Sequence, residues 1–466
     1  MAQEREIKYI NREFSDFKEQ LVEYAKNYFP NTYNDFSPTS PGTMFIEMAA
    51  YVGDVLSFYQ DTQLQETYLQ YAKDPGNLYS IAYMLGYRPK VSSVSEVEIT
   101  VTHNVPADSN YNPDYSQALS IASNAVLGAS LNNTVDFIID EKIDFSVSSS
   151  YQPTESFISQ LDNNGNPTEY TLRKKVKAFS GTVNTISEAI GSGEQFKTIL
   201  IDDDKIIEIL DIVDSDGNNY YEVPFLGQDT IIDQQVNNGV DSNSVPNLIK
   251  LRREARRFTT RFNSAGQLTI QFGAGIIGQD NNPFLPDPTN VGLGTNQGVS
   301  RIDYNYDPNN FLYTDAYGIA PANTTLTIRY LTGGGVEANV PANSIVNQKS
   351  VSISGGTPTV QATLAFTNLT PATGGRDGDS INELRENARR SFAEQGRAVT
   401  LQDYAFRALT LPPSFGSIAK AYVTQDQLVS KNSATDNIVD SNPLALSMYV
   451  LAYDSNKNVV TATESL

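Results

Sequence analysis

Apolar residues near the start of the chain recur at helical spacing and predict a first helix from Asn11 to Phe29. Pro30 follows directly and would end it. A second helix is expected from Ser40 to about Ala72, which spans on the order of 45 Å at 1.5 Å per residue. A third is expected from Asp74, its N-cap, to Gly86.

The second of these helices has an apolar first half and a polar, glutamine-rich second half. Its apolar stripe consists of Phe45, Met48, Val52, Leu56, Tyr59, Leu64, Tyr68 and Tyr71. A self-contained three-helix bundle and a bundle shared with another chain both fit this stripe. Periodicity alone leaves the two readings open.

From Val91 onward the pattern changes to strict alternation, which is typical of half-buried strands. Turn-rich segments separate the alternating runs as far as about Asn347. The sequence therefore predicts an α+β multidomain fold with an N-terminal long-helix bundle, β-rich middle domains and a C-terminal mixed α/β domain. The expected domains are 1–90, 91–195, 196–370 and 371–466.

Two capped helices are predicted in the last of these domains. Ser380 and Glu383 have the form of a capping box, and Gly396 is placed to end the helix that they begin. Thr400 and Asp403 open a second, shorter helix. Neither helix carries a cluster of catalytic residue types, which indicates a docking scaffold.

Composition narrows the classes of function. The 466 residues carry a net charge of −21, which argues against nucleic acid as the main ligand because phosphate binding needs a positive surface. The chain has no cysteine and one histidine, His103, so thiolate and histidine-cluster metal sites are excluded. We expect no cofactor, no metal and no enzymatic activity. No apolar run is long enough to span a bilayer, and the N-terminus lacks a signal-peptide pattern.

Three short motifs could each indicate a binding or catalytic site, but we favour a turn of the backbone at each of them. Phe272 to Gly278 contains GxGxxG, but the proline-rich segment after it cannot form the helix that a dinucleotide site needs, so a glycine turn is expected. Asp214 to Asn218 lacks most of a calcium loop and predicts a hairpin turn. Asp202 to Asp204 could serve a metal or a glycosidase, although a solvated turn is expected.

The segment from Lys250 to Arg261 holds six basic residues in an acidic chain. It could bind phosphate or RNA, or it could pair with carboxylates of this protein or of a neighbour. We favour a charged protein interface, because the planar guanidinium suits such pairs. The interface residues would be Arg252, Arg253, Arg256, Arg257 and Arg261.

The stretch from Ala372 to Tyr422 resembles the signature of the baseplate J-like family. The matching elements are a Thr-Gly-Gly, an arginine-rich helix, Arg-Ala-Val-Thr and Asp-Tyr. The residues that carry them are Gly374, Gly375, Arg385, Arg389, Arg390, Arg397, Asp403 and Tyr404. The resemblance extends to three further segments, Gly42 to Ala72, Phe272 to Gly275 and Tyr330 to Val340. The segment from Gly42 to Ala72 narrows the resemblance to the wedge subunits of contractile-tailed phages.

This resemblance implies a structural subunit of the virion tail baseplate, made and assembled in the host cytoplasm. Two copies would join in each wedge, and their N-terminal helices would pack with a larger wedge subunit. Wedges would close into an inner ring around the tail tube, which rearranges on tail contraction. The other implied partners are the sheath-initiator protein and, indirectly, the hub and tube proteins, with no nucleic acid and no membrane in the free state.

Two other functions stay open. One is the equivalent ring component of a contractile injection or secretion machine. The other, of a different class, is a glycan-binding or glycan-degrading tail protein, which would need paired carboxylates in a groove and exposed aromatic platforms. The resemblance also implies a C-terminal region beyond Leu466 that helps two copies pair, so the chain is expected to be a fragment or a short family member.

Overall fold

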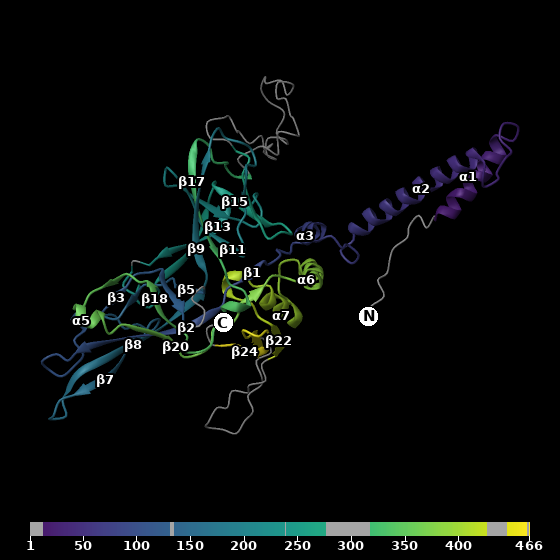
Figure 1. The fold of residues 1–466 in the computed structure, drawn as a ribbon. Helices are drawn as coiled ribbons and strands as arrows, with labels where there is room; N and C mark the ends of the chain where they lie inside the picture. The colour runs from purple at the N-terminus through teal and green to yellow at the C-terminus, as the bar shows by residue number, and fades with distance from the viewer. Residues whose placement is uncertain (1–12, 131–134, 238, 276–316, 426–444, 464–465) are drawn as a thin grey trace, which may run out of the picture. The chain divides into compact units, whose positions relative to one another are not determined.

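The computed structural model describes residues 13–130, 135–237, 239–275, 317–425, 445–463 and 466. The chain divides into two compact units. Unit 1 comprises Met1–Pro89 and Ser380–Gln395, and unit 2 comprises Lys90–Asp379 and Gly396–Leu466. All of the strands that the structure describes lie in the second unit (Figure 1).

The structure is mostly β, with 37% strand and 23% helix, and its sheets form barrel-like and half-barrel shapes. The expectation of an α+β fold with an N-terminal long-helix bundle is therefore wrong. Two features of the helices contribute to the error. The second helix ends earlier than its apolar stripe indicates, and the third helix packs against a segment that is distant in sequence.

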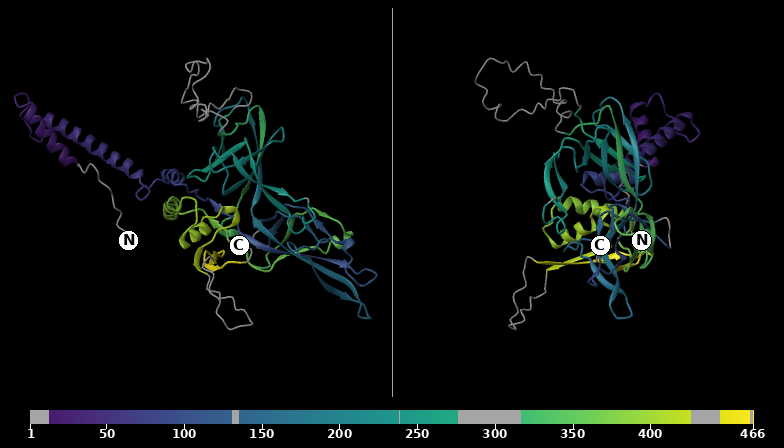
Figure 2. Two further views of the ribbon diagram at one scale, coloured as in Figure 1. Left: turned by 180° about the vertical axis from the view of Figure 1, so that it is seen from behind. Right: turned by 90° about the vertical axis from the view of Figure 1, so that its left-hand side faces the viewer.

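Helices α1 (Phe14–Tyr28) and α2 (Pro41–Glu66) form an antiparallel hairpin in unit 1, drawn in purple in Figures 1 and 2. Lys18 Nζ lies 2.7 Å from Glu47 Oε1 and ties the two helices together. Their connection is held by Tyr33, whose hydroxyl lies 2.8 Å from Ser40 Oγ. Gly42 faces the same ring so closely that a Cβ there would lie 2.3 Å from it. Both helices match the predicted positions apart from their ends.

The early end of α2 has a clear polar cause. Glu66 turns its carboxylate onto the following segment and accepts the amides of Lys73 at 2.9 Å and Asp74 at 3.1 Å. Thr67 bonds back to the Leu64 carbonyl at 2.7 Å. The Thr67 bond satisfies a carbonyl that the end of α2 leaves unpaired, and the Glu66 bonds hold the amides just before α3. Together these bonds favour a turn over continued helix.

Helix α3 (Pro75–Met84) packs on α6 (Ile381–Glu394), which is about 300 residues later in the chain. The Asp74 side chain caps α3, and the Ser380–Glu383 capping box begins α6, both as predicted. Their shared core consists of Ala72, Leu78, Ala82, Tyr87, Leu384 and Ala388. Local periodicity could place each helix but could not pair them.

The first large sheet of unit 2 has the strand order β18-β4-β5-β8-β2-β20, with β7 also paired to β8. Its strands are β18 (Ile345–Ser350), β4 (Ala125–Ala129), β5 (Asp136–Ile139), β8 (Pro167–Ser180), β2 (Glu96–Pro106), β20 (Ala365–Asn368) and β7 (Glu155–Leu161). Alternate residues of β2, such as Val97, Ile99 and Val101, enter the main core. The period-two pattern of the sequence is thus confirmed at the strand with the longest pairing.

The second large sheet has the order β10-β16-β15-β12-β11-β17-β9. Its strands are β10 (Thr198–Ile201), β16 (Leu268–Phe272), β15 (Arg257–Phe262), β12 (Asn219–Glu222), β11 (Ile206–Asp214), β17 (Thr324–Thr332) and β9 (Thr182–Ile190). The chain crosses from β8 of the first sheet to β9 of the second at Gly181. A Cβ at this position would lie 2.6 Å from the Leu331 side chain. Leu331 also packs with Val94, Ile138 and Ile207 in a small core.

Smaller sheets complete unit 2. They are β1 (Ser92–Ser93) with β21 (Arg376–Asp377), β13 (Thr230–Val236) with β14 (Asn247–Arg253), β19 (Ile353–Ser354) with β3 (Ser120–Ile121) and β6 (Ile143–Asp144), and β22 (Lys420–Gln425) with β23 (Leu446–Tyr453) and β24 (Val459–Thr461). The short helices are α5 (Pro358–Gln361), α7 (Leu401–Leu409), η1 (Tyr115–Gln117), η5 (Val336–Ala338) and η6 (Pro413–Phe415). Helix α7 packs on β22.

The structure bears on each of the three short motifs. Asp214 Oδ1 accepts the amides of Asp216 and Asn218 within the β11–β12 hairpin, so the predicted hairpin turn is confirmed. Asp202 and Asp203 lie between β10 and β11 and are hydrogen-bonded within the chain, to Gln267 and to Asn184 and Tyr330. Gly273 follows β16, but residues 276–278 of the glycine motif lie outside the described residues.

Candidate functional site

The face of α2 that meets α1 is built from small residues. Thr43, Ala50 and Ser57 are its buried positions, and they recur every seven residues, so they form one row along the helix. Gly53 lies beside this row, and a Cβ there would come within 3.1 Å of the Phe17 ring. The two helices approach closely because these side chains are small. The intramolecular contact therefore uses few of the large apolar residues of α2.

The opposite side of α2 carries large apolar residues in the open. Phe45, Val52 and Tyr59 also recur every seven residues, two positions after the buried row, and two residues correspond to about 200° around a helix. They are 64%, 55% and 60% exposed. Met48 and Leu56 flank this row, and Met44, Tyr51 and Phe58 form a second exposed row beside it. We call these eight residues the open face of α2.

An exposed apolar surface of this extent marks an interaction site in soluble proteins. Helix α1 does not cover it, and α1 has no buried residue of its own. Five of the predicted bundle residues lie on the open face. Leu64 lies in the last turn of α2 and is half-buried, whereas Tyr68 and Tyr71 lie in the turn after the helix, with ring centroids 6.4 Å apart.

Asn339 organises a junction in unit 2 that contains part of the predicted signature. Its Oδ1 accepts the Ser95 hydroxyl at 2.9 Å and the Gly375 amide at 2.8 Å, and its Nδ2 donates to the Gly375 carbonyl at 2.9 Å. Asn339 is buried, so each of these bonds satisfies a polar group that water cannot reach. Three segments distant in sequence therefore meet at one amide side chain.

The glycines of the signature are needed for this junction. A Cβ on Gly375 would lie 2.4 Å from the Gly335 carbonyl oxygen, and one on Gly334 would lie 2.4 Å from that of Ser93. Gly374 has φ +97° and lies against the backbone of Gly416. These positions allow close backbone approach, which side chains would prevent. The motifs themselves do not specify that these segments meet; the fold brings them together.

The other signature residues lie on or beside the two helices. On α6, Arg385 donates to the Ala72 carbonyl at 2.6 Å, while Arg389 and Arg390 are exposed. At the start of α7, the Asp403 carboxylate accepts the Thr400 and Val399 amides, and these bonds lower its pKa. Arg397 adds to that effect, and Tyr404 is exposed. Several of the described signature residues therefore cap helices or join segments of this chain that are distant in sequence.

The five predicted interface arginines do not share one surface. Arg252 lies over the Tyr221 ring, 4.8 Å from its centroid, and 3.4 Å from both Asp233 and Glu254. Arg253 lies 3.4 Å from Asp229. Arg257 is buried in β15 and donates to the Glu254 carbonyl, whereas Arg256 is half-buried and Arg261 is exposed. Carboxylates of the same chain therefore already lie beside Arg252 and Arg253.

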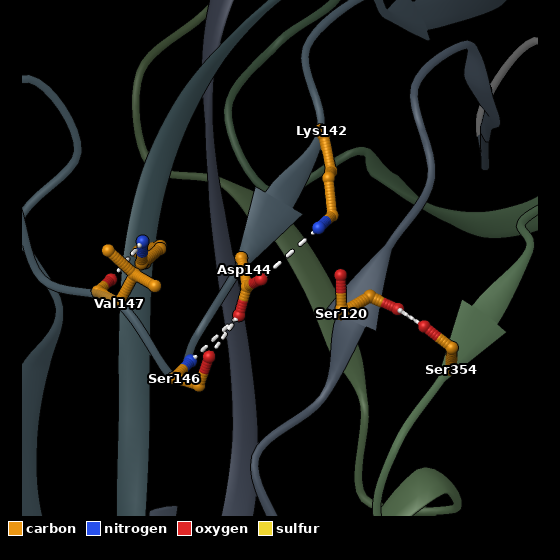
Figure 3. A network of polar contacts seen from close by, with 7 residues as sticks. Ser120, Lys142, Asp144, Ser146, Val147 and Ser354 are labelled. Atoms are coloured by element: carbon orange, nitrogen blue, oxygen red, sulfur yellow. Dashed lines mark hydrogen bonds and ion pairs between the residues drawn. The ribbon is translucent and has the colours of Figure 1, made fainter. Parts of the chain in front are cut away.

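A polar cavity of about 500 Å³ lies near the end of the β13–β14 ribbon. Among its lining residues, Tyr151 donates to Glu141, and burial together with that carboxylate raises the pKa of Tyr151 to about 12. Burial alone would raise the pKa of Asp144, but hydrogen bonds from Ser146 and Lys142 lower it (Figure 3). A carboxyl group with a lowered pKa is ionised near neutral pH and is unsuited to general acid catalysis.

Within the described residues, no group of three or more potential ligands is placed to hold a metal ion. Likewise, none of the described helices combines the length and apolar character needed to cross a membrane. Among the surfaces described above, the open face of α2 is the one that most clearly lacks a binding partner.

Residues 13–84, which contain this hairpin, match the family model described as bacteriophage baseplate protein, N-terminal domain. No curated protein matches the chain. The match supports a phage baseplate protein and suggests a structural component located in the virion tail baseplate.

Proposed function

We propose that the chain is a structural subunit of the baseplate wedge of a contractile phage tail, without enzymatic activity. Two copies join in each wedge and help to link wedges into the inner ring around the tail tube, which rearranges on contraction. The open face of α2 carries the proposal, because it lies in the segment that matches a baseplate domain and lacks a partner within the hairpin.

The partner that fits this face is a helical segment of another wedge subunit. The seven-residue spacing of Phe45, Val52 and Tyr59 is the spacing at which two helices pack side by side over several turns. The second exposed row, Met44, Tyr51 and Phe58, widens the face enough to contact a further helix. The sheath-initiator protein, and indirectly the hub and tube proteins, are further partners in this proposal.

The energy of this contact can be bounded. Full burial of a large apolar side chain contributes about 1.5–3 kcal/mol, and roughly 60% of each side chain is available, so each contributes about 1–2 kcal/mol. Removal of two such side chains should therefore weaken binding by roughly 30- to 1000-fold. The hairpin itself should stay intact, because these residues lie away from α1.

A mixing experiment tests the proposal. The full chain, alone and with the other wedge proteins, is analysed by light scattering after size exclusion, together with the variant Val52→Gln/Tyr59→Gln. We expect a stoichiometric complex for the wild type and its loss for the variant. The control Gln20→Ala/Glu23→Ala changes exposed polar positions of α1, away from the open face, and should bind normally. A wild-type chain that binds no wedge protein would refute the proposal.

A further inference from the structure

The polar cavity beside the β13–β14 ribbon lies between two walls that do not bond to each other. One wall is formed by residues between Asp140 and Gln152 together with Lys174 of β8, and the other by residues of the ribbon tip between Val236 and Asn247. Within the described residues, no hydrogen bond or ion pair joins the two walls. The volume of about 500 Å³ lies in the range of small-molecule sites, roughly 300–1,000 Å³. The cavity is therefore large enough for a ligand that bridges the walls.

Lys174 is the group in the cavity wall that most needs a further acceptor. The residue is only 2% exposed, and its Nζ donates to the Val147 carbonyl at 2.8 Å. This is its one hydrogen bond within the described residues, so two of its three N–H donors are unused. Burial lowers the pKa of Lys174, and the charge of Asp144 opposes that shift. A buried ammonium with a single acceptor is costly, so oxygen atoms of a ligand would stabilise it.

The carboxylates of the same wall can accept further hydrogen bonds. Asp144 Oδ1 accepts the amide and the hydroxyl of Ser146, and its Oδ2 accepts Lys142 Nζ (Figure 3). Each oxygen of Glu141 accepts one hydrogen bond from within the wall. A carboxylate can accept about four, so both groups retain capacity. This wall can therefore both donate to a ligand and accept from it.

The ribbon tip adds neutral polar groups and apolar surface. The side chains of Ser242, Asn243 and Asn247 make no hydrogen bond within the described residues. Each amide offers two donors and an acceptor oxygen. Val236 and Pro246 lie in the lining beside them and are apolar. The cavity thus combines unused donors and acceptors with an apolar surface.

The charges of the lining distinguish between classes of ligand. Three carboxylates and two ammonium groups face the cavity, so its charge is nearly balanced; they belong to Asp140, Glu141, Asp144, Lys142 and Lys174. An anion would meet the excess of carboxylates, and a cation would meet the buried ammonium. A neutral ligand rich in hydroxyl groups avoids both penalties, because each hydroxyl can donate and accept. A sugar ring has such hydroxyls along its edge and apolar C–H groups on its faces.

We propose that this cavity binds one sugar unit of a neutral saccharide. Hydroxyls on one edge of the ring accept from Lys174 and donate to Glu141. The opposite edge bonds to the Asn243 amide, and a C–H face lies on Val236. Asp144 is ionised near neutral pH and cannot act as a general acid, so the site binds without cleaving. This inference goes beyond the proposed wedge function and does not depend on it.

Binding is measured on the full chain. Free glucose, galactose, N-acetylglucosamine and their disaccharides are tested by saturation-transfer nuclear magnetic resonance, and an array of bacterial surface glycans shows whether the sugar is recognised within a polymer. We expect Lys174→Met to weaken binding of the saccharide found at least about tenfold, because it removes the buried donors. The matched control is Lys175→Met, which changes the next residue of β8. Lys175 lies on the opposite face, 2.8 Å from Glu98, so this variant should bind normally.

A second variant covers the case in which Lys174→Met fails to fold. Ser242→Ala/Asn243→Ala changes only the ribbon tip and should weaken binding at least about threefold, whereas Asn163→Ala/Asn164→Ala, in an exposed turn outside the cavity, should not.

Inorganic phosphate and NaCl provide the remaining controls. Binding of a neutral sugar should be insensitive to both, whereas an anion site would bind phosphate and weaken in salt. A chain that binds no saccharide, affinities unchanged by both cavity variants, or phosphate bound in place of sugar would overturn the inference. None of these outcomes would alter the wedge assembly that tests the proposed function.

Discussion

The only histidine of the chain should make the protein sensitive to mild acid. His103 lies in β2, fully buried, with its ring edge-on to Phe145 at a centroid distance of 4.3 Å. Its Nε2 accepts the Leu119 amide at 3.3 Å, which requires the neutral ring, and its Nδ1 has no hydrogen-bond partner among the described residues. Burial accordingly lowers the pKa of His103 from 6.5 to about 4.

The sign and size of the effect follow from linkage. Between pH 6.5 and pH 4 the unfolded chain binds a proton at this histidine and the folded chain does not, so the free energy of unfolding falls as the pH falls. Each pKa unit corresponds to about 1.4 kcal/mol, so the full shift corresponds to a loss of about 3 kcal/mol. Carboxylates titrate in the same range, so the prediction concerns the difference between the wild type and a histidine variant.

Urea denaturation at pH 7, 5.5 and 4.5 measures this difference. His103→Gln can keep an acceptor for the Leu119 amide but cannot titrate, and it should lose less stability than the wild type over the same interval. His103→Phe leaves that amide unpaired and should be less stable at every pH, by about 1–3 kcal/mol. A nuclear magnetic resonance titration of the single histidine should give a pKa near 4. A pKa near 6.5, or equal acid sensitivity of wild type and His103→Gln, would refute the reasoning.

Two further variants test other buried features. Gly375→Ala places a methyl group against the Gly335 carbonyl and Asn339, and should lower the free energy of unfolding by about 1–3 kcal/mol in chemical denaturation. The control Gly191→Ala adds a methyl group where no atom lies within 4 Å, and should change the free energy of unfolding little. A Gly375→Ala protein at least as stable as the wild type would contradict the close approach. Lys90 is buried, and burial lowers its pKa to about 8, although Asp379 opposes the shift. The unfolded chain therefore binds more protons between pH 8 and 10.5, and stability should rise with pH in this window by about 3 kcal/mol relative to Lys90→Met. An identical pH profile of wild type and Lys90→Met would show that Lys90 is charged when folded.

Features that depend on neighbours in sequence were predictable. The capping boxes at Ser380 and Thr400, the helix stop near Gly396 and the turn at Asp214 are all present, because each is set by hydrogen bonds within four residues. The end of α2 was missed because Glu66 uses a carboxylate to bond residues seven and eight positions ahead. An apolar stripe carries no information on such a bond.

The candidate site was predictable only in part. Periodicity identified the apolar stripe of α2, but it did not show that Thr43, Ala50 and Ser57 take up the contact with α1 and leave Phe45, Val52 and Tyr59 open. The seven-residue repeat of small side chains was the signal in the sequence that could have shown this. The junction at Asn339 and the cavity beside the β13–β14 ribbon depend on contacts between distant segments, which local patterns cannot specify.

The pairing of α3 with α6 also bears on how the chain folds during synthesis. Helix α3 is complete at Met84, but the helix that covers its apolar face ends at Glu394. At roughly 5–20 residues per second, the ribosome needs about 15–60 s to make the intervening segment. Throughout that interval Leu78 and Ala82 lack the side chains of Leu384 and Ala388 that complete their core. The nascent chain therefore emerges with an apolar helix that stays uncovered until most of unit 2 has been translated. We expect chaperones that bind exposed apolar segments to assist its folding in the cell.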